Sequence, residues 1–250
     1  MSGTERLVIL VKAAPHPSRR YQETVCCAGV TLEGEWRRLY PVRFRHLSGG
    51  AKFSRWDTIE YRWHIPKDDP RRESRRVEEQ SLAITGRLPR KDHAPLLDPL
   101  LRASYVDAAA RGETLTLVRP KSLSFRWRRK SDAEVAGEKT AFAAASAQGS
   151  LLDEPLKAFE PCPFHLRIGF EDAAGPHHMT CGDWETSAAF FNWRRSYGEA
   201  EALTRLKDVY ENTYMEKGVA LAMGTVAKRP KQWLLLGIIR LDEVFQPRFL

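Results

Sequence analysis

The chain has 250 residues, of which 42% are hydrophobic and 29% charged, an ordinary composition for a globular protein of one large or two small domains. No segment approaches the roughly 20 apolar residues of a membrane-spanning helix, and the N-terminus shows no signal-peptide pattern. We therefore expect a cytoplasmic protein with no membrane partner. Four cysteines in a chain of this length do not indicate a secreted disulfide framework.

The net charge of +8 is distributed unevenly along the chain. Residues 1–130 contain 27 basic and 15 acidic residues, a balance of +12, whereas residues 131–250 contain 13 and 17, a balance of −4. A basic half attracts polyanions through its electric field and through counterion release. We expect a nucleic acid as the partner. An anionic small molecule, an acidic protein partner and a plain solvated surface are the alternatives.

Residues 1–130 are predicted to be rich in β-strands, because short apolar or alternating segments are separated by turn residues. A charged loop is expected at residues 67–76. A helix is expected at residues 92–111, with Pro95 near its start and Gly112 just after its end. The strands are expected at residues 7–11, 23–30, 36–42, 56–63, 114–118 and 122–127.

Residues 131–155 are rich in Ala, Ser, Gly, Glu and Asp, and we interpret them as a linker or mobile loop. This segment would separate a basic β-rich module, residues 1–130, from an α+β module, residues 156–250. The fold class expected is α+β, with a β-rich, barrel-like N-terminal module and a smaller α+β C-terminal module. The C-terminal elements are expected to be strands at 164–170 and 177–181, helices at 184–197 and 199–214, and a closing hairpin of 219–226 and 232–241.

Arginines and aromatic residues are interleaved in four segments of the N-terminal half. Arginine makes bidentate contacts with phosphate, and aromatic side chains stack on unpaired bases. For any single tryptophan in these segments, a place in the core is the better interpretation. Arg71, Arg72, Arg75 and Arg76 are predicted to form a phosphate clamp, with acidic neighbours such as Asp69 and Glu73 as competing partners. The candidate nucleic-acid-binding residues are Arg37, Arg38, Arg43, Arg45, Arg71, Arg72, Arg75, Arg76, Arg126, Arg128, Arg129 and Lys130.

Catalytic candidates are few. Asp183 and Glu185, at positions i and i+2, would share one face at the end of a strand and could bind a metal or act as acid and base. We favour the alternative that Asp183 caps a helix and Glu185 lies in its first turn. A nuclease site would also need a nearby lysine or third carboxylate, and none is adjacent. Cys26 or Cys27 could act as a nucleophile, but no spacing to a histidine matches a known signature.

Cys162, His165, His178 and Cys181 form a C-x2-H and an H-x2-C pair, which resemble two halves of a tetrahedral zinc site. Residues three apart on a regular strand face opposite sides of the sheet. We therefore expect no stoichiometric zinc. The chain also has no phosphate-binding glycine-rich loop and no H-E-x-x-H or G-x-S-x-G motif, so no cofactor is expected.

Four short segments, at residues 23–26, 36–42, 69–74 and 183–185, resemble blocks of a poorly characterised prokaryotic protein family. The β-rich N-terminal half is also loosely similar to PUA-like and ASCH-type small barrels, which bind RNA or modified bases. The ASCH signature, Gly-x-Lys-x-x-Glu-x-Arg, is absent, so no site residue is carried over. The resemblance implies a barrel fold and nucleic-acid binding only.

Together these observations predict a nucleic-acid-binding protein that holds RNA or DNA with arginine clusters and exposed aromatic residues. One alternative is an enzyme that acts on nucleic acid, either a nuclease or a base-modifying hydrolase. Another is a basic module that docks on an acidic protein partner. Bound metal would favour the enzyme, whereas steeply salt-dependent binding without turnover would favour the binding protein.

Overall fold

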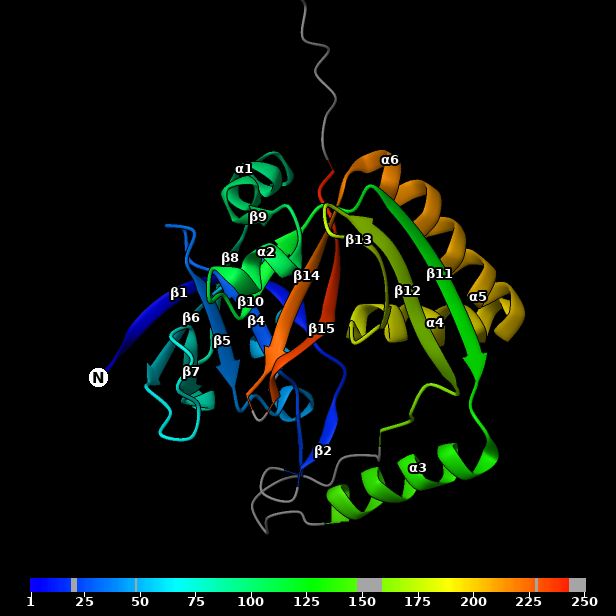
Figure 1. The fold of residues 1–250 in the computed structure, drawn as a ribbon. Coiled ribbons are helices and arrows are strands. Elements are labelled where there is room, and N and C mark those ends of the chain that lie inside the picture. Colours follow the sequence, from blue (N-terminus) through cyan, green and yellow to red (C-terminus); the bar gives the residue numbers. More distant parts are fainter. Residues whose placement is uncertain (19–21, 48, 148–158, 228, 243–250) are drawn as a thin grey trace, which may run out of the picture.

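A computed structural model describes residues 1–18, 22–47, 49–147, 159–227 and 229–242 (Figure 1). Its N-terminal part is a closed β-barrel. The strands follow the order β1-β4-β5-β7-β6, and pairing of β1 with β6 closes the barrel. β8 is added to the free part of the β6 edge, and β5 and β7 run parallel. The strands are β1 (Ser2–Lys12), β4 (Cys27–Val30), β5 (Trp36–Tyr40), β6 (Asp57–His64), β7 (Ser74–Val77) and β8 (Ala83–Arg87).

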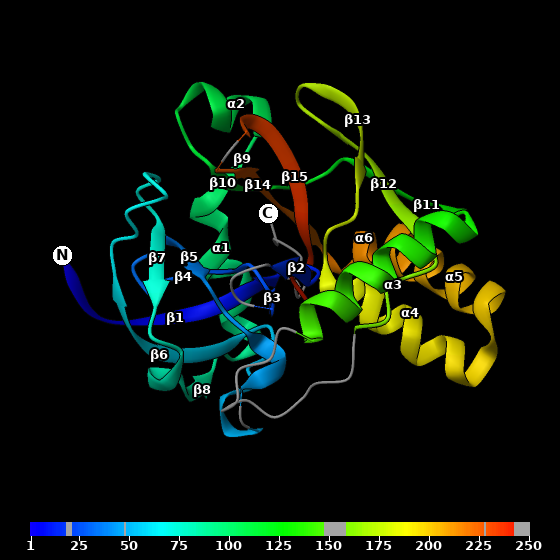
Figure 2. The ribbon, with the colours of Figure 1, turned by 90° about the horizontal axis from the view of Figure 1, so that it is seen from below.

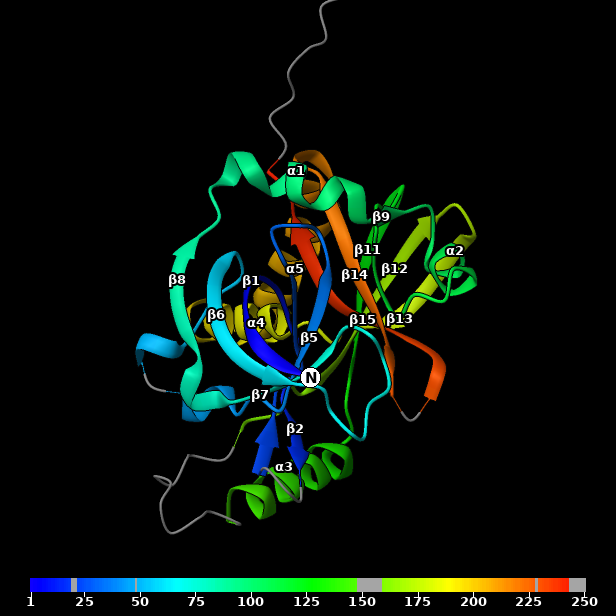
Figure 3. The same cartoon turned by 90° about the vertical axis from the view of Figure 1, so that its left-hand side faces the viewer.

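Two further sheets lie beside the barrel in Figures 1 and 3. One has the strand order β15-β14-β10-β9, and the other has the order β11-β12-β13. Their strands are β9 (Leu101–Arg102), β10 (Leu115–Val118), β11 (Ser122–Arg129), β12 (Phe164–Asp172), β13 (Gly175–Thr180), β14 (Val219–Val226) and β15 (Arg229–Arg240). β2 (His16–Ser18) and β3 (Gln22–Thr24) form a separate ribbon. The predicted closing hairpin is confirmed as β14 and β15.

The larger helices belong to the C-terminal part, and Figure 2 shows α4 and α5 on one side of the β11–β13 sheet. The α-helices are α1 (His93–Leu97), α2 (Tyr105–Ala110), α3 (Asp132–Ala147), α4 (Trp184–Tyr197), α5 (Glu199–Asp208) and α6 (Met215–Lys217). A π-helix, η6 (Val209–Tyr214), joins α5 to α6. The 3₁₀-helices are η1 (Phe44–His46), η2 (Gly49–Ala51), η3 (Glu79–Ser81), η4 (Arg90–Asp92) and η5 (Asp98–Leu100). No helix among the described residues is both long enough and apolar enough to cross a bilayer.

Three groups of buried apolar side chains hold the sheets together. One fills the barrel and includes Leu39 and Ile59. A second, which includes Leu10 and Ala222, lies between the outer barrel wall and the β10–β14–β15 strands. A third, which includes Leu221, lies between β14, β15, the β11–β13 sheet and helices α4 and α5. Because alternate residues of β14 belong to the second and third groups, this strand is buried on both faces and reads as an apolar run in the sequence.

The α+β fold predicted from the sequence, with a barrel-like N-terminal module and a smaller α+β C-terminal module, is confirmed. The single helix predicted at residues 92–111 is wrong. Pro99 interrupts the segment, since proline cannot donate the hydrogen bond that a helix interior needs. Leu101 and Arg102 then extend and pair with β10, so that only short helices remain on either side.

The part of the expected linker that the structure describes contains the sixteen-residue helix α3. Ser131 and Glu134 form a reciprocal capping box, each side chain accepting from the other residue's backbone N–H. Phe142 and Ala145 are its buried residues. Residues 148–155 lie outside the described residues. The sheets also connect the two sides of this segment, because β11 pairs with β12 and β10 pairs with β14.

A buried ion pair connects the barrel to the C-terminal part. Arg55, just before β6, donates from Nη2 to both carboxylate oxygens of Asp183, at 3.1 and 3.0 Å. Its other nitrogens donate to the carbonyl oxygens of Leu10 and Ile238, on β1 and β15. Asp183, only 1% exposed, also accepts from the backbone N–H groups of Glu185 and Ile238. Burial alone would lower the pKa of Arg55, but Asp183 and Glu185 outweigh that effect and raise it.

Replacing Asp183 with Asn should reduce the free energy of unfolding by about 3–5 kcal/mol, because the variant leaves the Arg55 charge buried without its counterion. Urea denaturation measures the change. Asp107→Asn is the matched control, since Asp107 pairs with Arg111 on an exposed helix surface and should cost only about 0.3–0.5 kcal/mol. Equal losses in the two variants would contradict the anchoring role of the buried pair.

Candidate functional site

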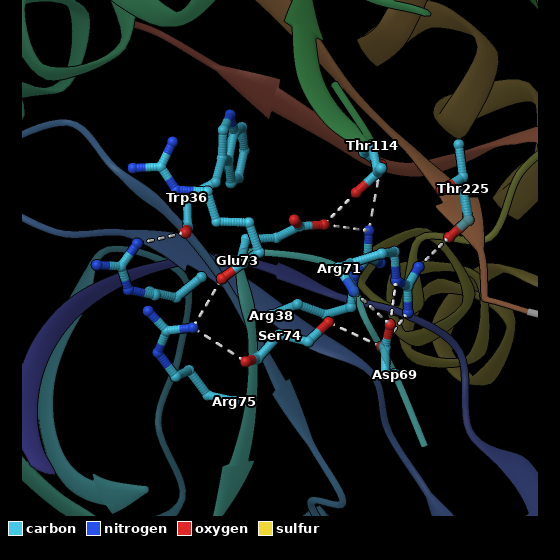
Figure 4. Close-up of polar contacts among 11 residues, drawn as sticks. Trp36, Arg38, Asp69, Arg71, Glu73, Ser74, Arg75, Thr114 and Thr225 are labelled. Atoms are coloured by element: carbon cyan, nitrogen blue, oxygen red, sulfur yellow. Dashed lines mark hydrogen bonds and ion pairs between the residues drawn. The ribbon is translucent and has the colours of Figure 1, made fainter. Parts of the chain in front are cut away.

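Arginines from β5, from β7 and from the loop before β7 gather on one side of the barrel, near β10 and β14 (Figure 4). β5 and β7 run parallel, with Arg38 beside Ser74 and Leu39 beside Arg75. This pairing brings two segments that are about 35 residues apart in the chain into one cluster. The candidate residues in this cluster are Arg37, Arg38, Arg71, Arg72 and Arg75.

Arg71 is a structural link rather than a free cation. Its Nε and Nη2 atoms bind both carboxylate oxygens of Asp69, at 2.8 and 2.6 Å, and its Nη1 donates to the Thr225 carbonyl at 2.7 Å. Burial would raise the pKa of Asp69, but hydrogen bonds from Arg71 and Ser74 outweigh it and lower that pKa. Arg71 therefore ties the barrel loop to β14.

Arg37 and Arg75 converge on Glu5 of β1. Arg37 Nε lies 2.8 Å from Glu5 Oε1, and Arg75 Nε lies 3.5 Å from Glu5 Oε2. The Tyr61 hydroxyl also donates to Glu5, at 3.0 Å, and the Arg75 guanidinium lies 4.1 Å from the centre of the Trp63 ring. Burial and the Glu5 carboxylate raise the pKa of Tyr61. Both arginines are therefore part of the polar network inside the barrel wall.

Arg38 is the most deeply buried of the cluster, at 6% exposed. Its Nη2 donates to the Thr114 carbonyl at 3.2 Å and lies 3.5 Å from Glu73 Oε1, while its Nε makes no hydrogen bond with the part of the chain that the structure describes. The Thr114 hydroxyl donates to the same Glu73 oxygen. Burial, and next the charge of Arg71, lower the pKa of Arg38. This residue connects β5 to the start of β10 and is not accessible to a phosphate.

Arg72 differs from its neighbours, because its exposed side chain makes no hydrogen bond or ion pair with any described residue. It lies at the edge of a cavity of about 370 Å³ between the barrel and the C-terminal part. Trp36, Leu100 and Leu115 supply apolar surface there. The remaining lining residues are Gly34, Glu35, Arg37, Glu73, Arg102, Arg111, Gly112, Glu113 and Thr114.

The other barrel candidates are Arg43 and Arg45, which lie outside β5 and β7, and Arg76, which lies opposite Tyr40 in the β5–β7 pairing. Arg43 forms an ion pair with Glu79 at 2.9 Å. The guanidinium of Arg45 lies 5.8 Å from the centre of the Phe159 ring, and Arg76 is half-buried. Several tryptophans and tyrosines of these segments belong to the core, as expected for single aromatic residues. Trp56 and Trp63 are each 8% exposed.

The exposed face of the β11–β13 sheet carries a second group of basic residues. Arg126 lies directly opposite Arg167, and Arg128 lies opposite His165. His178 lies opposite Gly169, where a Cβ atom would come within 2.9 Å of the His178 ring. The alternate residues, such as Phe125, point the other way and pack with buried residues of α4 and α5. We call this group, Arg126, Arg128, His165, Arg167 and His178, the basic sheet face.

Arg167 was not among the sequence candidates, although the alternation predicted for residues 164–170 already assigned it to the polar side of a strand. Glu134 of α3 lies at one end of the face, 2.9 Å from His165 and 3.7 Å from Arg128. Hydrogen bonds from the Ser131 backbone and from His165 lower the pKa of Glu134 to about 2. Arg129 and Lys130 are paired with Glu199 and Glu138.

The interpretation of Asp183 as a helix cap is confirmed, with Glu185 in the first turn of α4. The lysine that a nuclease site would need does come close, because Lys12 of β1 lies 2.9 Å from Glu185. Asp183, however, is fully occupied by Arg55 and by backbone N–H groups. The two carboxylates therefore do not form a pair that could share a metal or a proton.

The thiols are poor nucleophiles in this structure. Burial raises the pKa of Cys26 and, more strongly, that of Cys27. Burial and the nearby Asp183 carboxylate raise the pKa of Cys181 to about 12. A raised pKa keeps a thiol protonated at neutral pH, and only the thiolate attacks.

The zinc candidates do not converge. The hairpin register places Gly169 opposite His178 and Arg167 opposite Thr180, and His165 binds Glu134 instead. Cys181 lies 3.5 Å from the Thr186 hydroxyl. Within the described ranges, no group of three or more His, Cys, Asp or Glu side chains is placed to hold a metal ion.

Two family descriptions match the chain, and both are domains of unknown function. Residues 3–101 match DUF8758, and residues 100–248, more than half of the chain, match DUF8757. The chain belongs to the DUF8757 family. No curated protein matches it. Neither description names a PUA-like or ASCH-type barrel, so that resemblance stays a prediction.

The meeting point of the DUF8758 and DUF8757 regions agrees with the sheets. The barrel strands and β8 end at Arg87, and the two larger sheets beside the barrel begin at Leu101. The basic sheet face lies entirely within the DUF8757 region, whereas residues of both regions line the cavity.

Replacing Arg71 with Gln should lower the free energy of unfolding by about 1.5–3 kcal/mol, because Asp69 loses its charged hydrogen-bond donor. Arg72→Gln is the matched control and should change it by less than about 0.5 kcal/mol. Chemical denaturation of both variants measures the difference. An unaltered Arg71→Gln protein would show that this arginine is free, as the predicted phosphate clamp requires.

A thiol-reactive chromophore should label Cys27 and Cys181 slowly in the folded protein at pH 8, and both rapidly after unfolding in guanidinium. The reason is that their raised pKa values keep the thiolate fraction small until the pH rises far above neutral. Rapid labelling of either cysteine in the folded state, located by mass spectrometry, would contradict this picture.

Proposed function

We propose that this protein binds nucleic acid and that the basic sheet face contacts the phosphate backbone. The observation that carries the proposal is the Arg126–Arg167 pair. The two arginines lie directly opposite each other on neighbouring antiparallel strands, and both are exposed. Neither makes a hydrogen bond or an ion pair with a described residue.

Like charges at directly opposed positions of a sheet destabilise it, because their Cβ atoms lie only about 4.5–5.5 Å apart. Most basic residues elsewhere in the candidate set avoid this cost through nearby carboxylates, as Arg71 does with Asp69. An anion between Arg126 and Arg167 would remove it. Guanidinium groups bind phosphate oxygens bidentately, so a phosphate of a polynucleotide fits between them.

Neighbouring side chains provide further groups that could contact phosphate along the sheet. Arg128 follows Arg126 on the same face of β11, and Thr180 lies beside Arg167 on β13. The pairing of Arg128 with Glu134 is exposed on both sides, so it contributes little and exchanges readily for a phosphate. Trp127 points to the opposite side of β11. This face therefore contacts the phosphate backbone of the nucleic acid rather than its bases, and we expect little sequence preference.

Replacing Arg126 and Arg167 together with Gln should weaken binding to a 20-nucleotide single strand and to the matching duplex. The slope of log affinity against log salt is negative, and its magnitude should decrease by about 0.7 per lost single-strand contact, or about 0.9 per lost duplex contact. Fluorescence anisotropy at several salt concentrations measures both quantities.

The matched control is the Arg90→Gln, Arg195→Gln variant, which removes the same charge from exposed arginines that also lack partners among the described residues. Its salt slope should stay close to that of the unaltered protein. Equal losses in the two double variants would show that only net charge matters. Binding to an acidic protein but to neither oligonucleotide would favour the docking module instead.

A further inference from the structure

The cavity between the barrel and the C-terminal part has features that the basic sheet face does not explain. Its volume of about 370 Å³ lies within the range of roughly 300–1,000 Å³ typical of small-molecule sites, which often form between domains. Residues of both matched regions contribute to its walls. The ion pairs that surround it show which groups remain available to a ligand.

Most charges around the cavity are already satisfied. Arg102 lies 2.8 Å from Glu113, and Arg37 binds Glu5 and Glu35. These pairs form the rigid walls of the site. They leave only a few lining groups to recognise an occupant.

Two arginines remain for an anion. Arg72 has no hydrogen bond or ion pair within the described chain. Among the described residues, Arg111, at the end of α2, pairs only with Asp107 one turn earlier, and its side chain is 61% exposed. Such a surface pair exchanges easily for a stronger anionic partner. Because the two arginines come from the barrel side and from α2, an anion could be held between them.

Glu73, which lines the cavity, has one carboxylate oxygen left as an acceptor. Both hydrogen bonds that fix Glu73, from Thr114 and Arg38, reach its Oε1 atom. Its Oε2 accepts from no group in the described ranges and is not sealed from solvent. In Figure 4 the Glu73 carboxylate lies between the Trp36 ring and Thr114. A ligand N–H placed there would find an anchored acceptor.

The Trp36 indole, half-buried, offers a flat apolar wall beside Leu100 and Leu115. Flat rings pack well against such a surface. The site thus combines a planar wall, a fixed acceptor for an N–H group and two guanidinium groups at its edge. We propose that this cavity binds a nucleoside phosphate unit, with the base against Trp36, an N–H of the base donating to Glu73, and the phosphate between Arg72 and Arg111.

Titration calorimetry of the full chain with AMP, GMP, CMP and UMP tests this assignment. At least one should bind with one site per chain. Arg72→Gln should weaken it by about tenfold or more, while the corresponding nucleoside binds both proteins equally, because it lacks the phosphate. A monophosphate whose base lacks the exocyclic amine should bind less tightly than its parent.

Arg195→Gln is the matched control, since it removes an exposed arginine on α4 that likewise lacks a partner among the described residues. No saturation by any of the four monophosphates at concentrations up to about 1 mM would overturn the proposal. Equal effects of Arg72→Gln and Arg195→Gln would overturn it as well.

Two competition experiments distinguish a free mononucleotide from the end of a nucleic-acid strand as the natural occupant. Displacement of the mononucleotide by a 5′-phosphorylated oligonucleotide, but not by its unphosphorylated form, would identify the end of a strand as the occupant. Displacement by neither would identify the free mononucleotide. The Arg126→Gln, Arg167→Gln protein should bind mononucleotide normally, so failure of this proposal and failure of the basic sheet face are separate results.

Discussion

The buried pair of Arg55 and Asp183 determines how the two halves of the molecule fit together. Removing both charges from water is costly, and the geometry offsets this cost with two bonds within the pair and with backbone partners on β1, β15 and α4. The position of β15 sets that of β14 and then β10, which carries Thr114 to Arg38 on the barrel wall. The cavity lies beside Thr114 and Leu115, between the start of β10 and the loop that contains Arg72.

The cost of burying an unpaired charge also explains why the basic N-terminal half does not present a basic surface everywhere. Where the barrel meets another element, a charged side chain must acquire a partner or remain in water. Arg37, Arg71 and Arg75 have acquired carboxylates and support the barrel. Arginines without a partner among the described residues lie where the side chain stays exposed to water. These are Arg126 and Arg167 on the outer face of the β11–β13 sheet and Arg72 at the cavity.

The two proposed binding surfaces differ in character. The basic sheet face is an open array of basic side chains that includes no Phe, Tyr or Trp, which suits contacts with a repeating anion. The cavity is small, partly apolar and lined by both charge signs, which suits a single polar molecule. Their residues come from different strands, so a substitution in one leaves the other intact.

Local sequence signals determined several strands and helix ends of this protein. Alternation predicted the strand that carries Arg167, and Asp183 was predicted as a helix cap. The Ser131–Glu134 capping box is also a local signal, but the interpretation of residues 131–155 as a linker missed it. Only the tertiary structure decided that Arg71 binds β14, that Lys12 meets Glu185 and that Arg126 faces Arg167 unpaired. Local propensities act over a few residues, whereas these partners depend on strand register between segments far apart in the chain, which only the packed whole determines.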